Sequence, residues 1–301
     1  MRIAITGASG FIGRYIVREL AQAGHELCCW HRPDSDRSGF DGLECEWREG
    51  DLGDRAAAVR LVDGCDAVVH SALHHPGGGF RGGEGEITDF AHTNIVGTLQ
   101  LIEAARQAGV GRFVFLSTCA VHDQILEDRP LDETHPLWAS NHYGAHKAAI
   151  EKFIHSYGFG SGFPICALRP SGVYGVTDPI QRSKWHDLIR DVVGGKSVTC
   201  ERGGKEVHAA DVAKAVALLL DAEVSAITGQ AFNCYDLYVS EWDVAHLAKQ
   251  LAGSSSDIGG RQTSPKHQIV TDKIKRLGMQ FGGRDQLQAT VRSLVETITA
   301  T

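Results

Sequence analysis

The sequence lacks several features that would assign it to a class at once. None of its eight cysteines forms a CxxC pair, so free thiols in a reducing compartment are the simplest expectation. No apolar run reaches the roughly 18 residues that a membrane-spanning helix needs. Residues 1–6 have the pattern of a structural strand rather than of a signal peptide. These absences predict a soluble, cytoplasmic protein with no membrane partner.

An excess of basic residues is also missing. Lys and Arg total 30 against 37 Asp and Glu, which gives a formal net charge of −7 with the 15 histidines neutral. Non-specific nucleic-acid binding depends on Lys and Arg that neutralise phosphates, so we expect no nucleic-acid partner. The 43% hydrophobic and 22% charged residues are typical of a globular protein and exclude a disordered or fibrous one.

Glycine, by contrast, is abundant, with 35 of 301 residues where a share of about 7% is usual. Residues 76–85 read PGGGFRGGEG and hold six of these glycines. Two interpretations of this segment stay open, a solvated linker and a lid beside a ligand.

Apolar runs alternate with amphipathic stretches in the first half of the chain. The runs predict strands at residues 3–6, 25–30, 67–70, 112–116 and 164–168, and the stretches predict helices at 11–23, 55–62, 91–108 and 143–157. This alternation is typical of a doubly wound α/β fold, a mostly parallel sheet covered on both faces. The pattern loosens after residue 169, which predicts a smaller mixed α/β lobe in the C-terminal part.

Gly7, Gly10 and Gly13 form a GxxGxxG motif between the first predicted strand and the first predicted helix. Glycines in this setting allow a tight turn, the approach of a pyrophosphate and close helix–strand packing, while the helix N-terminus attracts the phosphate. We therefore expect residues 1–168, with 205–236 returning to them, to form a Rossmann-type NAD(P)-binding domain. Residues 169–204 and 237–301 are expected to form the substrate-binding lobe.

The choice of cofactor depends on the end of the second strand, where a carboxylate would hold the ribose of NAD. No carboxylate precedes Asp34 there, and Arg32 could pair with the 2′-phosphate of NADP. NADP is therefore favoured over NAD, and a solvated arginine is the alternative. Asp51, after the next strand, could hold the adenine amine or belong to an ordinary turn.

Tyr143 and Lys147 are four residues apart in a predicted helix and so lie on one face of it. An ammonium beside a phenol favours the phenolate and lowers the tyrosine pKa. The tyrosine could then exchange a proton with a substrate hydroxyl or carbonyl. Ser117 and Thr118, at the end of the strand 112–116, could hydrogen-bond the same substrate oxygen.

With these motifs the chain resembles the extended short-chain dehydrogenase/reductase family, which includes the NAD-dependent epimerase/dehydratase proteins. The resemblance continues through GDL at 50–52, VVHSAL at 68–73, RFVFLST at 112–118, YGAHK at 143–147, LRPSGVYG at 168–175 and VHAADVA at 207–213. It implies Thr118, Tyr143 and Lys147 as the catalytic residues and a homodimer formed through helices 91–108 and 143–157. The cofactor-binding residues that it implies, together with the motifs above, are Gly7, Gly10, Phe11, Ile12, Gly13, Arg32, Asp51, Leu52, Ser71, Ala72, Leu73, Asn94, Ser117, Tyr143, Lys147, Pro170 and Val173.

Two departures from the family pattern bear on the reaction. Cys119 and Ala120 stand where dehydratases carry an Asp-Glu pair, which disfavours dehydration. Gly204 stands where nucleotide-sugar enzymes carry an arginine, with Arg202 and Lys205 as neighbours, which favours a smaller sugar-like or keto substrate. Cys119 is also the position of an acid/base cysteine in the GDP-fucose synthase branch, although a buried structural thiol is the preferred interpretation.

The sequence therefore favours an NAD(P)-dependent oxidoreductase or epimerase that moves a hydride at a carbinol or carbonyl carbon. A nucleotide-sugar 4-epimerase and a non-catalytic NAD(P)-sensing protein remain as alternatives, and epimerase and reductase are not separated. No metal is expected, because His142 and His146 have zinc-compatible spacing but no third ligand.

Overall fold

A computed structural model describes residues 1–77 and 82–300 and contains a seven-stranded sheet, in which buried, mostly apolar residues form every strand but the edge strand at 45–49. Its strands are β1 Arg2–Thr6, β2 Glu26–His31, β3 Cys45–Glu49, β4 Ala67–His70, β5 Arg112–Leu116, β6 Ile165–Pro170 and β10 Gln230–Cys234. They lie in the order β10-β6-β5-β4-β1-β2-β3, and every neighbouring pair is parallel. The predicted Rossmann-type doubly wound sheet is confirmed, with β10 added beyond the usual six strands.

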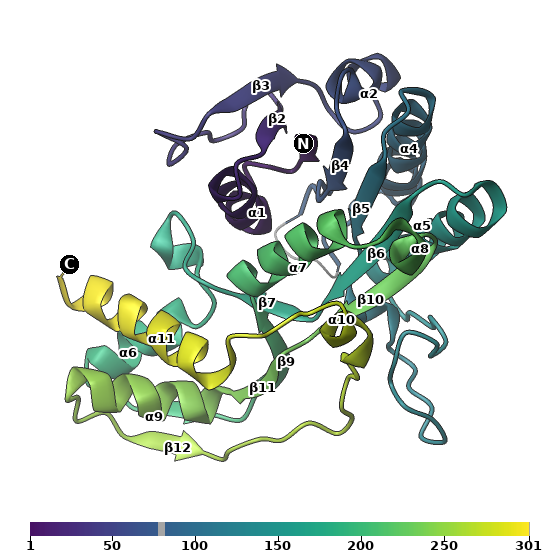
Figure 1. Cartoon of the computed structure of the whole chain (residues 1–301). Helices are drawn as coiled ribbons and strands as arrows, with labels where there is room; N and C mark the ends of the chain where they lie inside the picture. Colours follow the sequence, from purple (N-terminus) through teal and green to yellow (C-terminus); the bar gives the residue numbers. More distant parts are fainter. Residues whose placement is uncertain (78–81, 301) are drawn as a thin grey trace. The chain divides into compact units, whose positions relative to one another are not determined.

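The order reverses between β1 and β4, and ligands of such sheets bind beyond the carboxyl ends of the strands at this point. α2 (Arg55–Val62), α4 (Gly97–Gln107) and α5 (His142–His155) cover one face of the sheet (Figure 1). α1 (Phe11–Gln22) and α7 (Ala209–Asp221) lie on the other side. The order of the strands thus gathers the carboxyl-end loops in one place.

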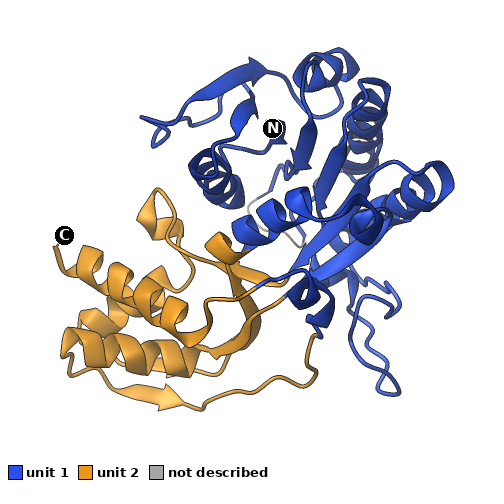
Figure 2. Cartoon of the chain, in the orientation of Figure 1, with its two compact units in different colours: residues 1–170, 212–234, 270–279 blue, residues 171–211, 235–269, 280–301 orange. Residues whose placement is uncertain are grey.

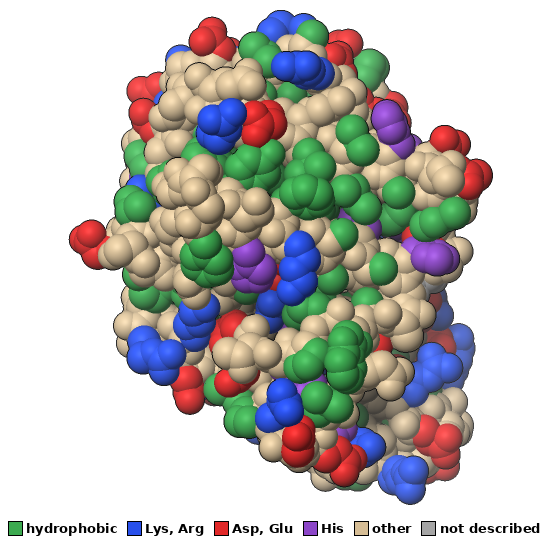
Figure 3. All heavy atoms as spheres, turned by 90° about the vertical axis from the view of Figure 1, so that its right-hand side faces the viewer, with side chains coloured by type: hydrophobic (Ala, Val, Ile, Leu, Met, Phe, Trp, Pro, Cys, Tyr) green, Lys and Arg blue, Asp and Glu red, His purple; other side chains and the backbone are tan. Residues whose placement is uncertain are grey.

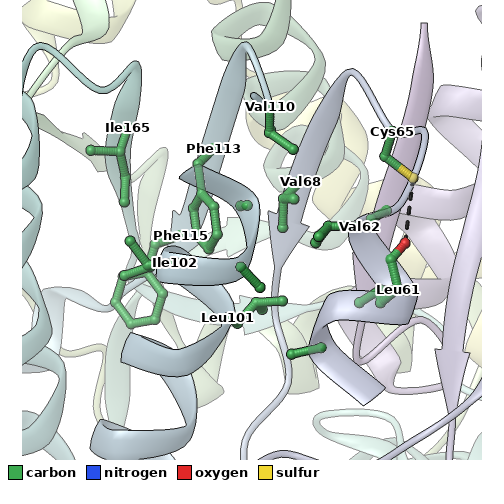
Figure 4. Packing of buried hydrophobic residues seen from close by; sticks show 14 of the residues in the cluster. Leu61, Val62, Cys65, Val68, Leu101, Ile102, Val110, Phe113, Phe115 and Ile165 are labelled. Carbon is green, nitrogen blue, oxygen red and sulfur yellow. Dashed lines mark hydrogen bonds between the residues drawn. The ribbon is translucent and has the colours of Figure 1, made fainter. Parts of the chain in front are cut away.

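Aromatic and branched side chains fill the space between the sheet and α2, α4 and α5 (Figure 4). Phe113 and Phe115 of β5 point to this side with Leu101 and Ile102 of α4, and all four are at most 1% exposed. This packing holds α4 and α5 against β5, the strand that precedes Thr118.

The helix expected at 91–108 is interrupted, a difference from the sequence prediction. α3 (Ile87–Ala91) is followed by a π-helical turn, His92–Val96, before α4 begins. The Asn94 amide donates to the Phe90 carbonyl at 3.0 Å, and the Thr98 hydroxyl donates to the Asn94 carbonyl at 2.6 Å. Polar side chains that bond to carbonyls of the preceding turn disturb the regular ladder, which periodicity alone does not reveal. A second π-helical turn, Ser156–Gly160, likewise follows α5.

The chain divides into two compact units (Figure 2). Unit 1 is Met1–Pro170, Val212–Cys234 and Val270–Met279, and unit 2 is Ser171–Asp211, Tyr235–Ile269 and Gln280–Thr301. These bounds differ from the expected ones in four places, two of which are short: residues 169–170 belong to unit 1, and residues 235–236 belong to unit 2. Residues 205–211 belong to unit 2, because β9 (Gly203–His208) pairs with the strands of that unit, and residues 270–279, with α10 (Asp272–Arg276), belong to unit 1.

Unit 2 contains short strands, and the sequence pattern predicts only the one at residues 197–200. β7 (Gly172–Tyr174), β9 and β11 (Leu237–Ser240) form a three-stranded sheet, while β8 (Val198–Cys200) pairs with β12 (Ile258–Gly260). Its apolar core lies among α6 (His186–Val193), α9 (Glu241–Ala252) and α11 (Gly283–Ala300). The remaining elements of the chain are α8 (Val224–Ile227) and the short turns Cys119–Val121 and Ile180–Arg182.

Two further expectations concern the whole chain. All eight cysteines are free thiols, as predicted. In the ranges 1–77 and 82–300, no helix is long and apolar enough to cross a membrane.

Candidate cofactor and active site

The glycine loop after β1 has no room for side chains. A Cβ on Gly13 would lie 2.0 Å from the Gly7 carbonyl oxygen, and a Cβ on Gly7 would lie 2.7 Å from the Ala72 amide nitrogen. Gly7 also has a φ of 71°, in the left-handed region that favours glycine. Gly10 caps α1 without a side chain, so the amides of the first turn, at Phe11 and Ile12, face outward from a bare helix end. Such an end suits a pyrophosphate.

Arg14, which the sequence analysis missed, fixes the loop that follows β2. Its side chain is buried, and it donates to the carbonyls of Ser9, Asp36 and Ser38. Its guanidinium carbon also lies 4.9 Å from the centre of the Phe40 ring. An arginine in an otherwise amphipathic helix is normally interpreted as a solvated residue, so no signal in the sequence marked this role.

Arg32 and Asp51 lie beyond the carboxyl ends of β2 and β3. The Arg32 side chain is 47% exposed, and its Nε lies 3.3 Å from Asp34 Oδ1. Asp51 is exposed and accepts a hydrogen bond from the amide of buried Leu52 at 2.8 Å. Both side chains are accessible to a ligand from solvent.

The segment after β4 is held from two sides. The Ser71 hydroxyl donates to the Thr6 carbonyl at 2.7 Å, and the Ala72 amide donates to the Thr6 hydroxyl at 3.2 Å. Asn94 is 2% exposed and bonds both the amide and the carbonyl of His74, at 2.8 and 2.9 Å. Asn94 therefore shapes the segment that contains Leu73 from a buried position. The Ser71 contact brings this segment against the glycine loop.

α5, which carries Tyr143 and Lys147, packs against the end of β5 and the turn that follows Thr118. Lys147 Nζ donates to the carbonyl of Leu116, the last residue of β5, at 2.7 Å. A Cβ on Gly144 would lie 2.5 Å from the Ala120 carbonyl, so this glycine lets α5 approach the turn that follows Thr118. The Thr118 hydroxyl accepts a hydrogen bond from the Ala120 amide at 3.1 Å, and this leaves its proton for another acceptor.

The start of α5 is fixed by a polar cap. The Asn141 side chain accepts from the Gly144 amide at 2.8 Å and donates to Asp123 Oδ2 at 2.6 Å. An N-cap of this kind contributes about 1 kcal/mol to helix stability. It also sets the position of Tyr143 in the first turn.

Lys147 is 4% exposed, and burial lowers its pKa to about 7 while the Glu151 carboxylate raises it. Its Nζ lies 4.5 Å from the centre of the Phe115 ring. Its charge therefore changes near neutral pH, where it can bias the protonation of Tyr143, one helical turn away.

Beneath Lys147 lies a buried ion pair that the sequence analysis did not identify. Glu151 and Arg169 are 0% and 1% exposed, and Arg169 Nη2 donates to Glu151 Oε2 at 2.5 Å. The Ser117 hydroxyl donates to Glu151 Oε1. Ser117, expected to bind the cofactor, thus bonds to the protein interior. The signal in the sequence that could have indicated this role of Glu151 was its position one helical turn beyond Lys147, on the same face of α5.

Cys119 lies at this ion pair rather than in an acid/base pair. Its thiol donates to the Arg169 carbonyl at 3.0 Å, and burial raises its pKa to about 12. A thiol of this kind stays protonated at neutral pH.

The remaining predictions concern Pro170, Val173, the segment 76–85 and a metal. Pro170 ends unit 1, whereas Val173 belongs to β7 in unit 2. Of the segment 76–85, residues 78–81 lie outside the described residues, so the choice between a linker and a lid stays open. In the described ranges, no group of three His, Cys, Asp or Glu side chains could hold a metal ion.

Comparisons with known proteins bear on the family and the fold of the chain. The model of the NAD dependent epimerase/dehydratase family matches residues 3–234. A 3 beta-hydroxysteroid dehydrogenase/Delta 5→4-isomerase of Mycobacterium tuberculosis is 32% identical over 198 residues, which cover 64% of this chain and 52% of that protein. The chain thus spans about half the length of this curated relative.

Two solved structures share the fold over the whole chain. UDP-glucose 4-epimerase of Thermotoga maritima, solved with UDP-glucose, has a TM-score of 0.82 at 21% identity and covers 100% of this chain and 99% of its own. UDP-glucose 4-epimerase of Thermus thermophilus, solved with NAD, has a TM-score of 0.79 at 24% identity with both chains covered to 100%.

Buried neutral histidines predict that the fold is sensitive to acid. Burial lowers the pKa of His70 and of His146 to about 3 and that of His122 to about 4. The unfolded chain takes up these protons below its usual histidine pKa of about 6.5, so the free energy of unfolding should fall by up to about 1.4 kcal/mol per pH unit for each histidine. Urea denaturation at pH 7.5 and 5.5 measures this. A His70→Gln variant should show a shallower decline, and equal stability at both pH values would contradict the prediction.

Proposed function

Because the chain belongs to the NAD dependent epimerase/dehydratase family, we propose that it is an NAD(P)-dependent oxidoreductase or epimerase that acts on a carbinol or carbonyl carbon of a sugar-like molecule. The observation that carries this proposal is the joint placement of Tyr143 and Lys147 on α5, with Lys147 bonded to the end of β5. Unit 1 also contains the glycine loop, so one unit holds the parts for a cofactor and for proton transfer.

The residues of the glycine loop suit the cofactor. The space over Gly7 and Gly13 excludes any side chain, and the first turn of α1 would hold the pyrophosphate. When bound, the nicotinamide cofactor exchanges a hydride with the substrate carbon.

Tyr143 exchanges the proton of the substrate oxygen in this proposal. The Lys147 ammonium stabilises the phenolate form of Tyr143 and so lowers the barrier to that exchange. The Thr118 hydroxyl, whose oxygen already accepts from Ala120, donates its proton to the substrate oxygen and orients it. Cys119, with its raised pKa and its bond to Arg169, is unsuited to the acid/base work of dehydration.

A charge in unit 2 supports a substrate without a nucleotide diphosphate. A Cβ at Gly204 would lie 2.3 Å from the Glu206 carboxylate, so this carboxylate occupies the place beside the residue where nucleotide-sugar enzymes carry an arginine. Glu206 is 3% exposed and pairs with Lys184 Nζ at 2.5 Å. An arginine side chain at position 204 would have to displace this ion pair, so unit 2 lacks the arginine that would hold a diphosphate there. Unit 2 is accordingly proposed as the lobe for a free sugar, sugar acid or keto compound.

A Tyr143→Phe variant tests the enzymatic role. With free sugars, sugar acids, keto compounds and nucleotide sugars as the substrate panel, kcat should fall by about 10²–10⁴-fold because the proton donor is lost. Cofactor affinity should stay essentially unchanged. Nicotinamide absorbance and product stereochemistry are followed together, since they separate a reductase from an epimerase. An unaltered kcat would remove Tyr143 from the mechanism, whereas cofactor binding without turnover of any compound would favour an NAD(P)-sensing protein.

We propose NADP as the preferred cofactor, with Arg32 pairing with the 2′-phosphate. The half-exposed guanidinium at the end of β2 supports this, because a charge-assisted hydrogen bond to phosphate is strong and bidentate. An Arg32→Ala variant should bind NADP about 10-fold or more weakly and NAD as before. Titration by nicotinamide fluorescence gives both affinities, with Arg60→Ala as a control on α2. Tighter binding of NAD than of NADP by the unaltered chain would refute the preference.

A homodimer through α4 and α5 is the proposed assembly. Val96, directly before α4, and Phe153 on α5 are large apolar residues that are 37% and 41% exposed. Figure 3 views the side on which these helices lie, and hydrophobic side chains gather in the middle of this face with charged ones mostly at its edges. Contiguous apolar surface of this kind is typical of an interface.

Light scattering should give twice the mass of the chain, and Phe153→Asp should give the mass of a monomer because a buried carboxylate opposes association. Val59→Asp, at an exposed position of α2, is the matched control and should leave the dimer intact. A monomer in the unaltered chain would disprove this assembly.

A further inference from the structure

A buried ion pair lies beside the proposed catalytic residues but contacts neither substrate nor cofactor in the mechanism above. Glu151 follows Lys147 by one turn of α5 and Tyr143 by two, so the three share one helix face. Arg169, in β6, donates to both carboxylate oxygens of Glu151 at 2.5 to 3.1 Å. Removing two charges from water is costly, and a buried ion pair is weak evidence for stability alone. The location of this pair points to a role in the site.

The ion pair is bonded to the same end of β5 as Lys147. Lys147 Nζ bonds to the carbonyl of Leu116, and the hydroxyl of the next residue, Ser117, bonds to Glu151. The Ser117 amide in turn donates to the Leu168 carbonyl of β6 at 2.7 Å, one residue before Arg169. Leu116 and Ser117, at the end of β5, thus bind Lys147 and Glu151, which lie one turn apart in α5. This arrangement fixes the height of Lys147 and Tyr143 above the sheet.

Arg169 is held on its far side by neutral partners. His122 Nδ1 lies 3.2 Å from the Pro136 carbonyl and donates to it, which leaves Nε2 to accept from Arg169 at 3.3 Å. Burial lowers the His122 pKa to about 4, in keeping with this neutral tautomer. The guanidinium also reaches the Glu133 carbonyl at 3.4 Å. Glu151 is therefore the ion-pair partner of Arg169, and the Glu133 carboxylate adds a weaker attraction.

The surroundings of Lys147 leave Glu151 as the acidic group that acts on it. The Phe115 ring faces Lys147 from β5, His70 faces it from β4, and His146 and Tyr143 are its neighbours on α5. Both histidines have a pKa of about 3, lowered first by burial and then by the lysine charge, so they are neutral and add no second positive charge beside Lys147. Burial lowers the Lys147 pKa to about 7, and Glu151 opposes this shift.

We propose that Glu151, held by Arg169 and Ser117, is a positioning residue that keeps Lys147 both in place and positively charged for its action on Tyr143. The inference deepens the proposed function, because the benefit of a charged Lys147 rests on the role of Tyr143 given there. The effect of Glu151 on Lys147 does not need catalysis and can be measured without it.

The test replaces Glu151 by glutamine, which keeps the shape and an acceptor for Ser117 but removes the charge. Titration of the lysine ¹³Cε resonances by NMR follows the protonation of Lys147, whose signal is identified by its loss in Lys147→Met. The Lys147 titration should move to lower pH by about one unit in Glu151→Gln, since a nearby carboxylate favours the charged ammonium. The pH profile of kcat should shift in the same direction, and its plateau should fall because less phenolate is stabilised.

Two further variants separate charge from folding. Ile154→Ala empties a buried position of the same helix without changing a charge and should leave the Lys147 titration where it is. If Glu151→Gln does not fold because Arg169 is left unpaired, the double variant Glu151→Gln/Arg169→Met removes both charges. Its Lys147 titration should move in the same direction but by less, because the Arg169 charge that opposes protonation of Lys147 is removed as well. An unmoved Lys147 titration in the folded variant overturns the proposal, whatever the activity. A shifted titration in a chain without turnover supports it and refutes the proposed function instead.

Discussion

The burial of one ammonium group at the end of β5 is the constraint on which the rest of the site depends. Taking Lys147 out of water costs free energy, and its pKa of about 7 reflects that cost. The Leu116 carbonyl, the Phe115 ring and the Glu151 carboxylate stabilise the charge again. Each of these groups sits in a regular element, so the position of Lys147 is as rigid as the sheet.

Glycines allow the close approach of backbone segments around the site. Gly7 and Gly13 bring backbone close to backbone where β1, the segment after β4 and α1 meet, and Gly144 does so where α5 meets the turn after Thr118. At each place a Cβ would approach other atoms to less than 3 Å. The high glycine content of the chain therefore has a partial explanation in the cofactor loop and in the close approach of α5.

The sequence predicted the inner strands of the sheet because they are continuous apolar runs that leave little choice of structure. The edge strand β3 has no such run, because its residues are only partly buried or exposed. The sequence also predicted the shared helix face of Tyr143 and Lys147, which depends on spacing alone. The π-helical turn at His92–Val96 and the roles of Arg14 and Glu151 were missed. The two roles depend on side-chain bonds to partners that are distant in sequence, from Arg14 to the loop after β2 and from Glu151 to Arg169. In unit 2, β7, β11 and β12 were missed because three or four residues carry too weak a periodicity. β9 was missed because its first four residues are glycines and charged residues.

The central claim is that the end of β5 and α5 together hold the reactive end of a nicotinamide cofactor. A crystal structure of the chain with NADP or NAD bound tests it most directly. We expect the pyrophosphate at the first turn of α1 and the nicotinamide ribose within hydrogen-bond distance of Lys147, with Lys147 Nζ still on the Leu116 carbonyl. A nicotinamide bound away from α5, or a Lys147 that has left the end of β5, would contradict the account.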